Sequence, residues 1–216
     1  MYTLNFIPLT HICCGEFATA KAQADEVVAL ADKKGSLFWK AFGMMNQGCV
    51  LALIGRAPDA VQIINSGITA WQSTGATLWA PFRKSLLAKA YAELDQFEDA
   101  WRCISQAMTI METTKERWCE ADINRIAGEI AMMSPERDVT RAEDYFDRAL
   151  TVARQQQAKS WELRAAMSLA RLWRDQGKPQ QARELLAPVY GWFTEGFDTR
   201  DLKEAKALLD ELAHSS

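Results

Sequence analysis

A repeated spacing of alanines and apolar residues, about 40 residues long, most constrains how this chain folds. In each copy an alanine is followed by an alanine or an apolar residue four positions on, and by a small or apolar residue three positions later. The leading alanines are 40, 40, 42 and 40 residues apart, at Ala20, Ala60, Ala100, Ala142 and Ala182. Offsets of three, four and seven place side chains on one face of a helix. The repeat therefore predicts a series of similar helices.

Two further markers keep nearly the same step and indicate a second helix in each unit. Tryptophans recur at Trp39, Trp79, Trp118 and Trp161, and small residues at Gly48, Ala88, Gly128 and Ala170. We expect the first helix of each unit (helix A) at 36–54, 76–94, 115–133 and 158–176. The second (helix B) is expected at 17–33, 57–73, 97–114, 140–156 and 180–194. The small residues would let A and B approach closely, and the tryptophans would wedge between units. No stretch alternates with period two, so no sheet is predicted.

These residues resemble the tetratricopeptide repeat (TPR), whose pattern has Trp-x2-Leu-Gly-x2-Tyr on helix A and Ala-x3-Phe on helix B. The best copy is Leu87-Ala88-x2-Tyr91 with Ala100-x3-Ile104-x2-Ala107, and the second is Leu169-Ala170-x2-Trp173 with Ala182-x3-Leu186. The chain departs from the TPR pattern in two ways. The position of the pattern's early tryptophan is occupied by Met44, Lys84, Asn124 and Ala166, and the period is near 40 residues rather than 34. The resemblance implies an interaction role.

The longer period and the closing segment 191–209 look like the C-terminal helical tails of large bacterial signalling ATPases. That group includes maltose-type activators and nucleotide-cyclase proteins. The resemblance covers residues 16–213 and implies a sensor or protein-interaction role. The chain carries no cyclase or ATPase domain, so that activity does not carry over.

The predicted fold is all-α: an α-α superhelix, in which antiparallel helix pairs form a TPR-like solenoid closed by a C-terminal capping helix. We divide the chain into a non-repeat segment at 1–15, the repeat array at 16–197 and the cap at 198–216. A capping helix at 199–213 has the polar outer face that the end of a solenoid requires. Residues 1–15 do not resemble a helix A, and Pro8 is expected to break one. Their apolar side chains would fold over the open end or meet a second copy.

Composition limits the function classes. The formal net charge is −3, with 49% hydrophobic and 25% charged residues, so a broad nucleic-acid footprint is not expected. Neither a spanning segment nor a signal peptide is predicted. We therefore expect no membrane partner and a cytoplasmic location. Five cysteines at irregular spacing fit free thiols better than a disulfide framework. Cys49, Cys103 and Cys119 are expected in the core or the groove.

No catalytic residue, cofactor or metal site is predicted. The two histidines, His11 and His214, lie near the termini, and phosphate-loop, dinucleotide and zinc-protease motifs are absent from the sequence. His11-x-Cys13-Cys14 offers metal-type ligands without an evident fourth ligand, so a buried thiol in an end segment is the preferred reading. Trp71, Trp101 and Trp192 fall outside the periodic series and are better candidates for the surface.

The remaining candidate site is a partner-binding groove along the A helices. Its expected residues are Phe42, Met45, Phe82, Lys89, Arg125, Arg164, Met167, Arg171 and Arg174. The first half is apolar and the second is basic, and arginine forks suit carboxylates. One hypothesis is an amphipathic or acidic peptide in the groove. The other is a solvated face on which the arginines pair with Asp122, Glu129 and Glu162.

The sequence therefore predicts a non-catalytic scaffold for a protein or peptide partner, in bacterial signalling or transcription regulation. A small-molecule sensor that binds its ligand in the concave groove is the alternative. An enclosed pocket lined by Phe42, Met45, Phe82 and arginines would favour the sensor. A homodimer formed through the N-terminal end is a further hypothesis.

Overall fold

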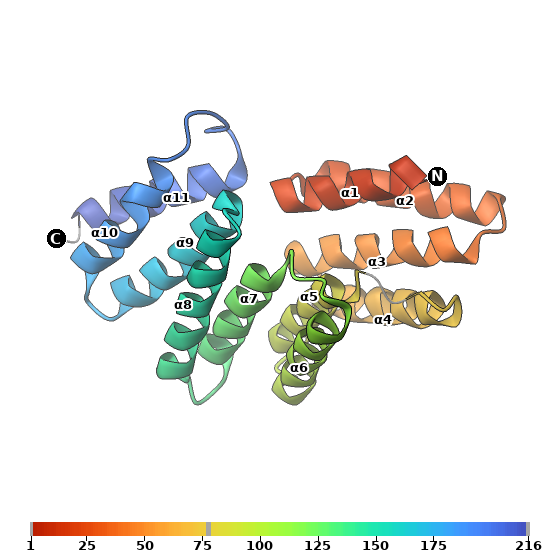
Figure 1. Cartoon of the computed structure of the whole chain (residues 1–216), viewed down its shortest axis with the longest axis horizontal. Helices are drawn as coiled ribbons and strands as arrows, with labels where there is room; N and C mark the ends of the chain where they lie inside the picture. Colours follow the sequence, from red (N-terminus) through yellow and green to blue (C-terminus); the bar gives the residue numbers. More distant parts are fainter. Residues whose placement is uncertain (1, 77–78, 215–216) are drawn as a thin grey trace. The chain divides into compact units, whose positions relative to one another are not determined.

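The computed structural model describes residues 2–76 and 79–214, and within these ranges all regular secondary structure is α-helical (Figure 1). The predicted all-α class is confirmed. The chain divides into two compact units, Met1–Glu116 and Arg117–Ser216, and the division falls inside the predicted repeat array. Each unit is described by itself. None of the helices in the described ranges is long and apolar enough to cross a membrane.

Unit 1 is built from antiparallel helix pairs. Its helices are α1 (Tyr2–Cys14), α2 (Phe17–Lys33), α3 (Leu37–Leu53), α4 (Ala57–Ser73), α5 (Ala80–Glu93) and α6 (Phe97–Thr114). The most extensive packing joins α3 to α4, α5 to α6 and α2 to α3. The A helices α3 and α5 also contact each other, as do α1 and α3, so neighbouring pairs stack.

Unit 2 continues the same pattern. Its helices are α7 (Glu120–Met133), α8 (Val139–Gln155), α9 (Lys159–Asp175), α10 (Pro179–Tyr190) and α11 (Arg200–His214). The closest packing is between α7 and α8 and between α9 and α10, and α11 contacts both α9 and α10. Leu202, Ala205, Leu208 and Leu212 of α11 are buried, whereas Lys203, Lys206 and Asp210 are exposed. The predicted capping helix is thus present.

Small residues bring the helices of a pair together, as the repeat predicts. A Cβ added to Gly48 would lie 2.4 Å from Cγ1 of Ile64, and one added to Gly128 would lie 2.5 Å from the ring of Phe146. The leading alanines of the B helices are completely buried: Ala20, Ala60, Ala100, Ala142 and Ala182. A side chain larger than glycine at Gly48 or Gly128 would require the two helices, or the side chain facing it, to shift.

The expectation that Pro8 prevents a helix at the N-terminus is wrong. Residues 2–14 form α1, with Pro8 inside it, and α1 packs on α2 and α3. An internal proline removes one backbone hydrogen bond. Pro8, Leu9 and Ile12 are buried, however, and burial of these apolar side chains outweighs the lost bond.

Two A helices begin later than the periodicity predicts. Helix α5 starts at Ala80 rather than 76, because Pro81 suits a first turn and Trp79 before it has a φ of 66°. Helix α7 starts at Glu120 rather than 115, since Lys115 ends α6 with a φ of 61°. Trp79 and Trp118 therefore lie in the connections and not on the helices.

Candidate partner-binding surface

The apolar residues predicted for the groove lie in the helix core. Phe42, Met45, Phe82 and Met167 are only 1–3% exposed. The ring centroid of Phe42 lies 5.6 Å from that of Phe6 and 5.4 Å from that of Trp71. The guanidinium carbon of Arg83 lies 4.4 Å from the same centroid. These side chains hold adjacent helices together in this structure, so they do not offer a surface to a partner.

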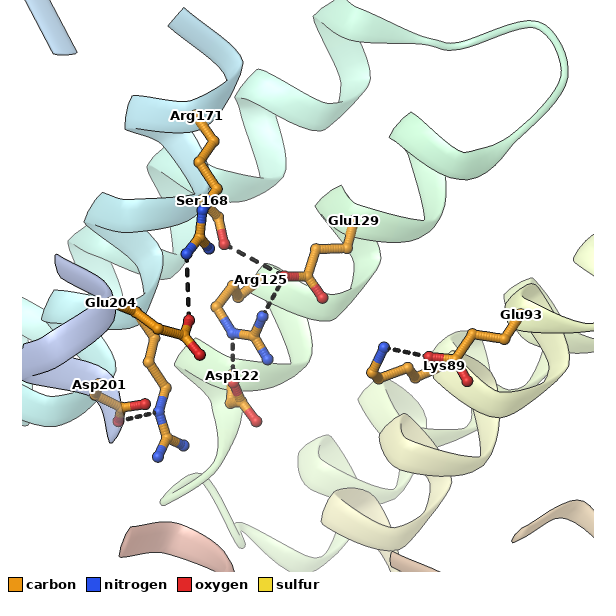
Figure 2. Close-up of polar contacts among 10 residues, drawn as sticks. Lys89, Glu93, Asp122, Arg125, Glu129, Ser168, Arg171, Asp201 and Glu204 are labelled. Atoms are coloured by element: carbon orange, nitrogen blue, oxygen red, sulfur yellow. Dashed lines mark hydrogen bonds and ion pairs between the residues drawn. The ribbon is translucent and has the colours of Figure 1, made fainter. Parts of the chain in front are cut away.

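Lys89 of α5 is half-buried and engaged within its own helix. Its Nζ donates a hydrogen bond to Glu93 at 2.6 Å, in an i,i+4 ion pair (Figure 2). Lys89 is the only predicted groove residue of unit 1 that has a charged side chain. The basic character predicted for the groove therefore depends on the four arginines of unit 2.

Arg125 of α7 lies between two carboxylates of its own helix. Its Nε donates to Asp122 at 2.7 Å and its Nη1 donates to Glu129 (Figure 2). The hydroxyl of Ser168, on α9, donates to the same Glu129 at 3.4 Å and joins the two A helices. Burial acts to lower the pKa of Arg125, but the two carboxylates outweigh it and raise the pKa. Arg125 is thus a permanently charged structural residue, with only 13% of its side chain exposed.

The three arginines of α9 form a row that meets the carboxylates of α11. Arg164 bonds Asp201 at 2.6 Å, Arg171 bonds Glu204 at 3.2 Å, and Arg174 bonds Glu211 at 2.7 Å. Figure 2 shows the side chains of Arg171 and Glu204 directed toward each other. The row therefore attaches the capping helix to the last complete helix pair.

The four predicted groove arginines of unit 2 differ in exposure: Arg125 and Arg164 are mostly buried, and Arg171 and Arg174 are more exposed. Arg171 and Arg174 expose 41% and 34% of their side chains, whereas Arg164 exposes 17% and also lies 4.9 Å over the ring of Trp161. Glu204 and Glu211, which pair with the outer arginines, are 37% and 58% exposed. Burial acts to raise the pKa of Glu204, but Arg200 and Arg171 together lower it below the ordinary value. The accessible part of the site therefore consists of the ion pairs made by Arg171 and Arg174. We call these two residues the outer arginine pair.

The hypothesis of a solvated, paired face named some of these partners correctly. Asp122 and Glu129 bind Arg125, but Glu162 binds Arg154 and Lys159 instead of the arginine row. Sequence reasoning missed the carboxylates of α11: Asp201, Glu204 and Glu211. A signal was available, because the expected cap carries acidic residues while the preceding A helix carries arginines.

Other candidates from the sequence are placed as follows. His11 bonds Glu16 at 2.6 Å, and Cys14 is exposed. Among the described residues, no three His, Cys, Asp or Glu side chains are grouped to hold a metal ion. The expected core cysteines Cys49, Cys103 and Cys119 are buried, and burial raises the pKa of Cys49 to about 12. Trp192 is 57% exposed, as predicted, whereas Trp71, at 4%, is not a surface residue.

Helix pairs of this length, stacked through small residues and followed by a cap, define a TPR-like helical repeat fold. Comparison with solved structures supports this class. Two crystal structures of a Podosopora anserina protein with nearly identical TPR-like repeats, assigned as a kinesin light chain, are similar. A substituted form of that protein matches with a TM-score of 0.57 and 18% identity, over 88% of this chain and 92% of that one. The second matches with a TM-score of 0.55 and 16% identity, over 97% and 95%.

Likeness at this level of identity establishes the fold and leaves function open. No protein-family model matches the chain. No curated protein matches it either. The resemblance to the tails of bacterial signalling ATPases therefore stays a hypothesis.

Proposed function

We propose that this chain is a non-catalytic protein-interaction scaffold that binds a carboxylate-bearing partner segment at the outer arginine pair. The observation that carries the proposal is the exposure of Arg171 and Arg174 within a TPR-like layer of A helices. Arginine presents a planar fork of donors that fits a carboxylate. The four buried apolar positions are not part of the proposed surface.

Exchange of ion pairs is the step that such binding needs. Arg171 and Arg174 already bond Glu204 and Glu211, whose carboxylates are more than a third exposed. Ion pairs of this exposure stabilise a fold by roughly 0–1 kcal/mol each. A partner carboxylate can therefore replace either glutamate at little cost, while Arg164 and Asp201, which are more buried, keep α11 attached.

The charge of this surface limits the kind of partner. Arginines and bonded carboxylates are present in nearly equal numbers on the described parts of α7, α9 and α11. Such a surface attracts a mixed or moderately acidic segment and not a highly acidic one. Binding should weaken as salt is added, because the exposed pairs are screened.

A matched pair of baits tests the proposal. We expect Arg171→Glu/Arg174→Glu to lose partners that wild type captures from the native host. Arg56→Glu/Arg102→Glu changes two exposed arginines of unit 1 by the same charge and should keep these partners. Direct titration of a captured partner should show a loss of at least tenfold, or about 1.4 kcal/mol, in the first variant. Equal affinities in both variants would refute the proposed surface.

The small-molecule sensor has less support. Phe42, Met45 and Phe82 are only 1–2% exposed, so they present little surface to a ligand. A role in signalling or transcription and a cytoplasmic location stay predictions. They rest on the sequence resemblance and on the absence of a predicted signal peptide.

Self-association through the N-terminal helix also stays a proposal. Leu4 and Ile7 of α1 are half-buried, and Thr10 and Cys14 are exposed. If a second copy packs there, Ile7→Glu should convert the dimer to a monomer in light scattering at equal concentration. A wild-type chain that is monomeric at all concentrations would exclude the homodimer.

A further inference from the structure

The turn that joins α2 to α3 lies at one end of unit 1 (Figure 1). Exposed lysines and apolar residues follow one another along this stretch of the chain. Helix α2 ends at Lys33, and Gly35 takes a φ of 63°. The amides of Gly35 and Ser36 bond the carbonyls of Asp32 and Ala31, at 3.1 and 2.9 Å. This is a hydrogen-bonded helix C-cap, so the turn has a defined shape.

Two large apolar side chains are exposed directly after this turn. Leu37 is 53% exposed and Phe38 is 37% exposed, although both begin a helix whose later residues are largely buried. The ring of Phe38 lies 4.4 Å from Trp71 and 4.8 Å from Trp39. These aromatic contacts fix the outward position of Phe38 and lower the entropy that ordering would cost on binding.

The charge around these side chains is positive. Lys33 and Lys34 are exposed, and neither has an acidic partner in the described part of the chain. The one acidic residue of the turn, Asp32, is paired with Lys40 at 2.7 Å. The nearby end of α4, residues 70–75, carries no charge. Lysines near a helix C-terminus also interact favourably with the negative end of the helix dipole. That interaction does not explain why Leu37 and Phe38 are exposed.

We propose that residues 33–40 form a docking surface for an anionic lipid bilayer, which we call the basic apolar tip. Leu37 and Phe38 enter the interfacial region, while Lys33 and Lys34 contact anionic headgroups. The tip is a turn between two helices, so its side chains can enter a planar surface, whereas a peptide ligand is normally held in a groove. Lysine stems can follow the apolar surface while the ammonium groups stay at the headgroups. Interfacial binding of this kind needs no spanning segment, so it differs from the expectation that the chain has no membrane partner.

Sedimentation of the full chain with vesicles tests this proposal. We expect binding to vesicles of equal phosphatidylserine and phosphatidylcholine, and much weaker binding to phosphatidylcholine alone. Each lysine near an anionic surface contributes about fivefold, so Lys33→Gln/Lys34→Gln should weaken binding roughly thirtyfold. Leu37→Ser/Phe38→Ser should weaken it about tenfold through lost apolar contact. Lys33, Lys34 and Leu37 are exposed, whereas Phe38 also packs on Trp71 and Trp39. Circular dichroism of both variants should show unchanged helix content.

Matched controls lie elsewhere on the chain. Ile54 is 47% exposed at the opposite end of α3, two positions before Arg56 in the sequence, and Ile54→Ser should leave vesicle binding unchanged. Lys178→Gln/Lys203→Gln removes two exposed lysines of unit 2 and should also have no effect.

Three outcomes would overturn the proposal. One is no binding to the phosphatidylserine vesicles in low salt, and another is equal binding by the tip variants and wild type. The third is a polyglutamate peptide that binds the chain through Lys33 and Lys34 while vesicles do not. That result would assign the tip to an acidic protein. None of these outcomes depends on Arg171 or Arg174, so the scaffold proposal is tested separately.

Discussion

Single glycines set how closely the two helices of a pair approach. At Gly48 an added Cβ would lie 2.4 Å from Cγ1 of Ile64 and 3.0 Å from its backbone nitrogen. We therefore expect Gly48→Ala to lower the free energy of unfolding by about 1–3 kcal/mol, since the helices must move apart. Urea unfolding followed by circular dichroism measures this. Because Ile64→Ala removes the nearest atom, the double variant should lose less stability than the two single losses added together.

A buried charge at the residue scale gives a second prediction. Arg125 holds Asp122, whose side chain is only 4% exposed. Arg125→Met would leave that carboxylate buried without its cation, which costs about 3–5 kcal/mol. Arg102→Met breaks the exposed pair with Asp99 and should cost at most about 1 kcal/mol. If the two variants unfold at the same urea concentration, Arg125 does not have the structural role assigned to it.

Helix α11 is attached to α9 partly through the carboxylates of Asp201, Glu204 and Glu211. The pKa of Glu204 is held below its ordinary value of 4.5, because Arg200 and Arg171 outweigh the effect of burial. A carboxylate with a lowered folded-state pKa contributes stability above the unfolded pKa, and this contribution is lost as pH falls through the folded pKa. We therefore expect attachment of α11 to weaken below pH 4.5. Hydrogen exchange in α11 should increase there before exchange in α8 does.

A variant provides the control for this pH dependence. Arg171→Gln/Arg200→Gln removes both arginines that lower the pKa of Glu204. Its α11 should exchange faster at neutral pH and show a smaller further increase in acid. Identical pH profiles for the variant and wild type would mean that other contacts attach the helix.

The whole molecule should not unfold as one cooperative system. Its two compact units are each made from helix pairs that contact mainly their neighbours along the chain. In such arrays stability is nearly a sum of local contributions. Gly48→Ala should therefore raise amide exchange in α3 and α4 much more than in α8 and α9. An equal rise throughout the chain would indicate global cooperativity instead.

The sequence by itself determined the class of fold and most helix positions. Helices α2, α4 and α6 have the predicted bounds, because the apolar spacing is local. Gly35, Gly55 and Gly75 mark the turns beside α2 and α4, and Asp95 and Lys115 take positive φ on either side of α6. The contacts of Gly48 and Gly128 were predicted for the same reason: one repeated spacing places equivalent side chains on equivalent faces. The resemblance to the TPR pattern also rests on the repeated small and apolar residues alone.

The tertiary structure alone decided which predicted groove residues are accessible. An A helix packs against its own B helix and against neighbouring A helices, so apolar residues such as Phe42 and Met167 are buried on faces that the periodicity does not distinguish. The pairing of Arg171 with Glu204 joins residues 33 positions apart on different helices. Helix α1 was missed because its packing on α2 and α3 compensates for Pro8. Local spacing encodes a helix and its faces, but burial and ion pairing depend on the side chains that other helices bring to each face.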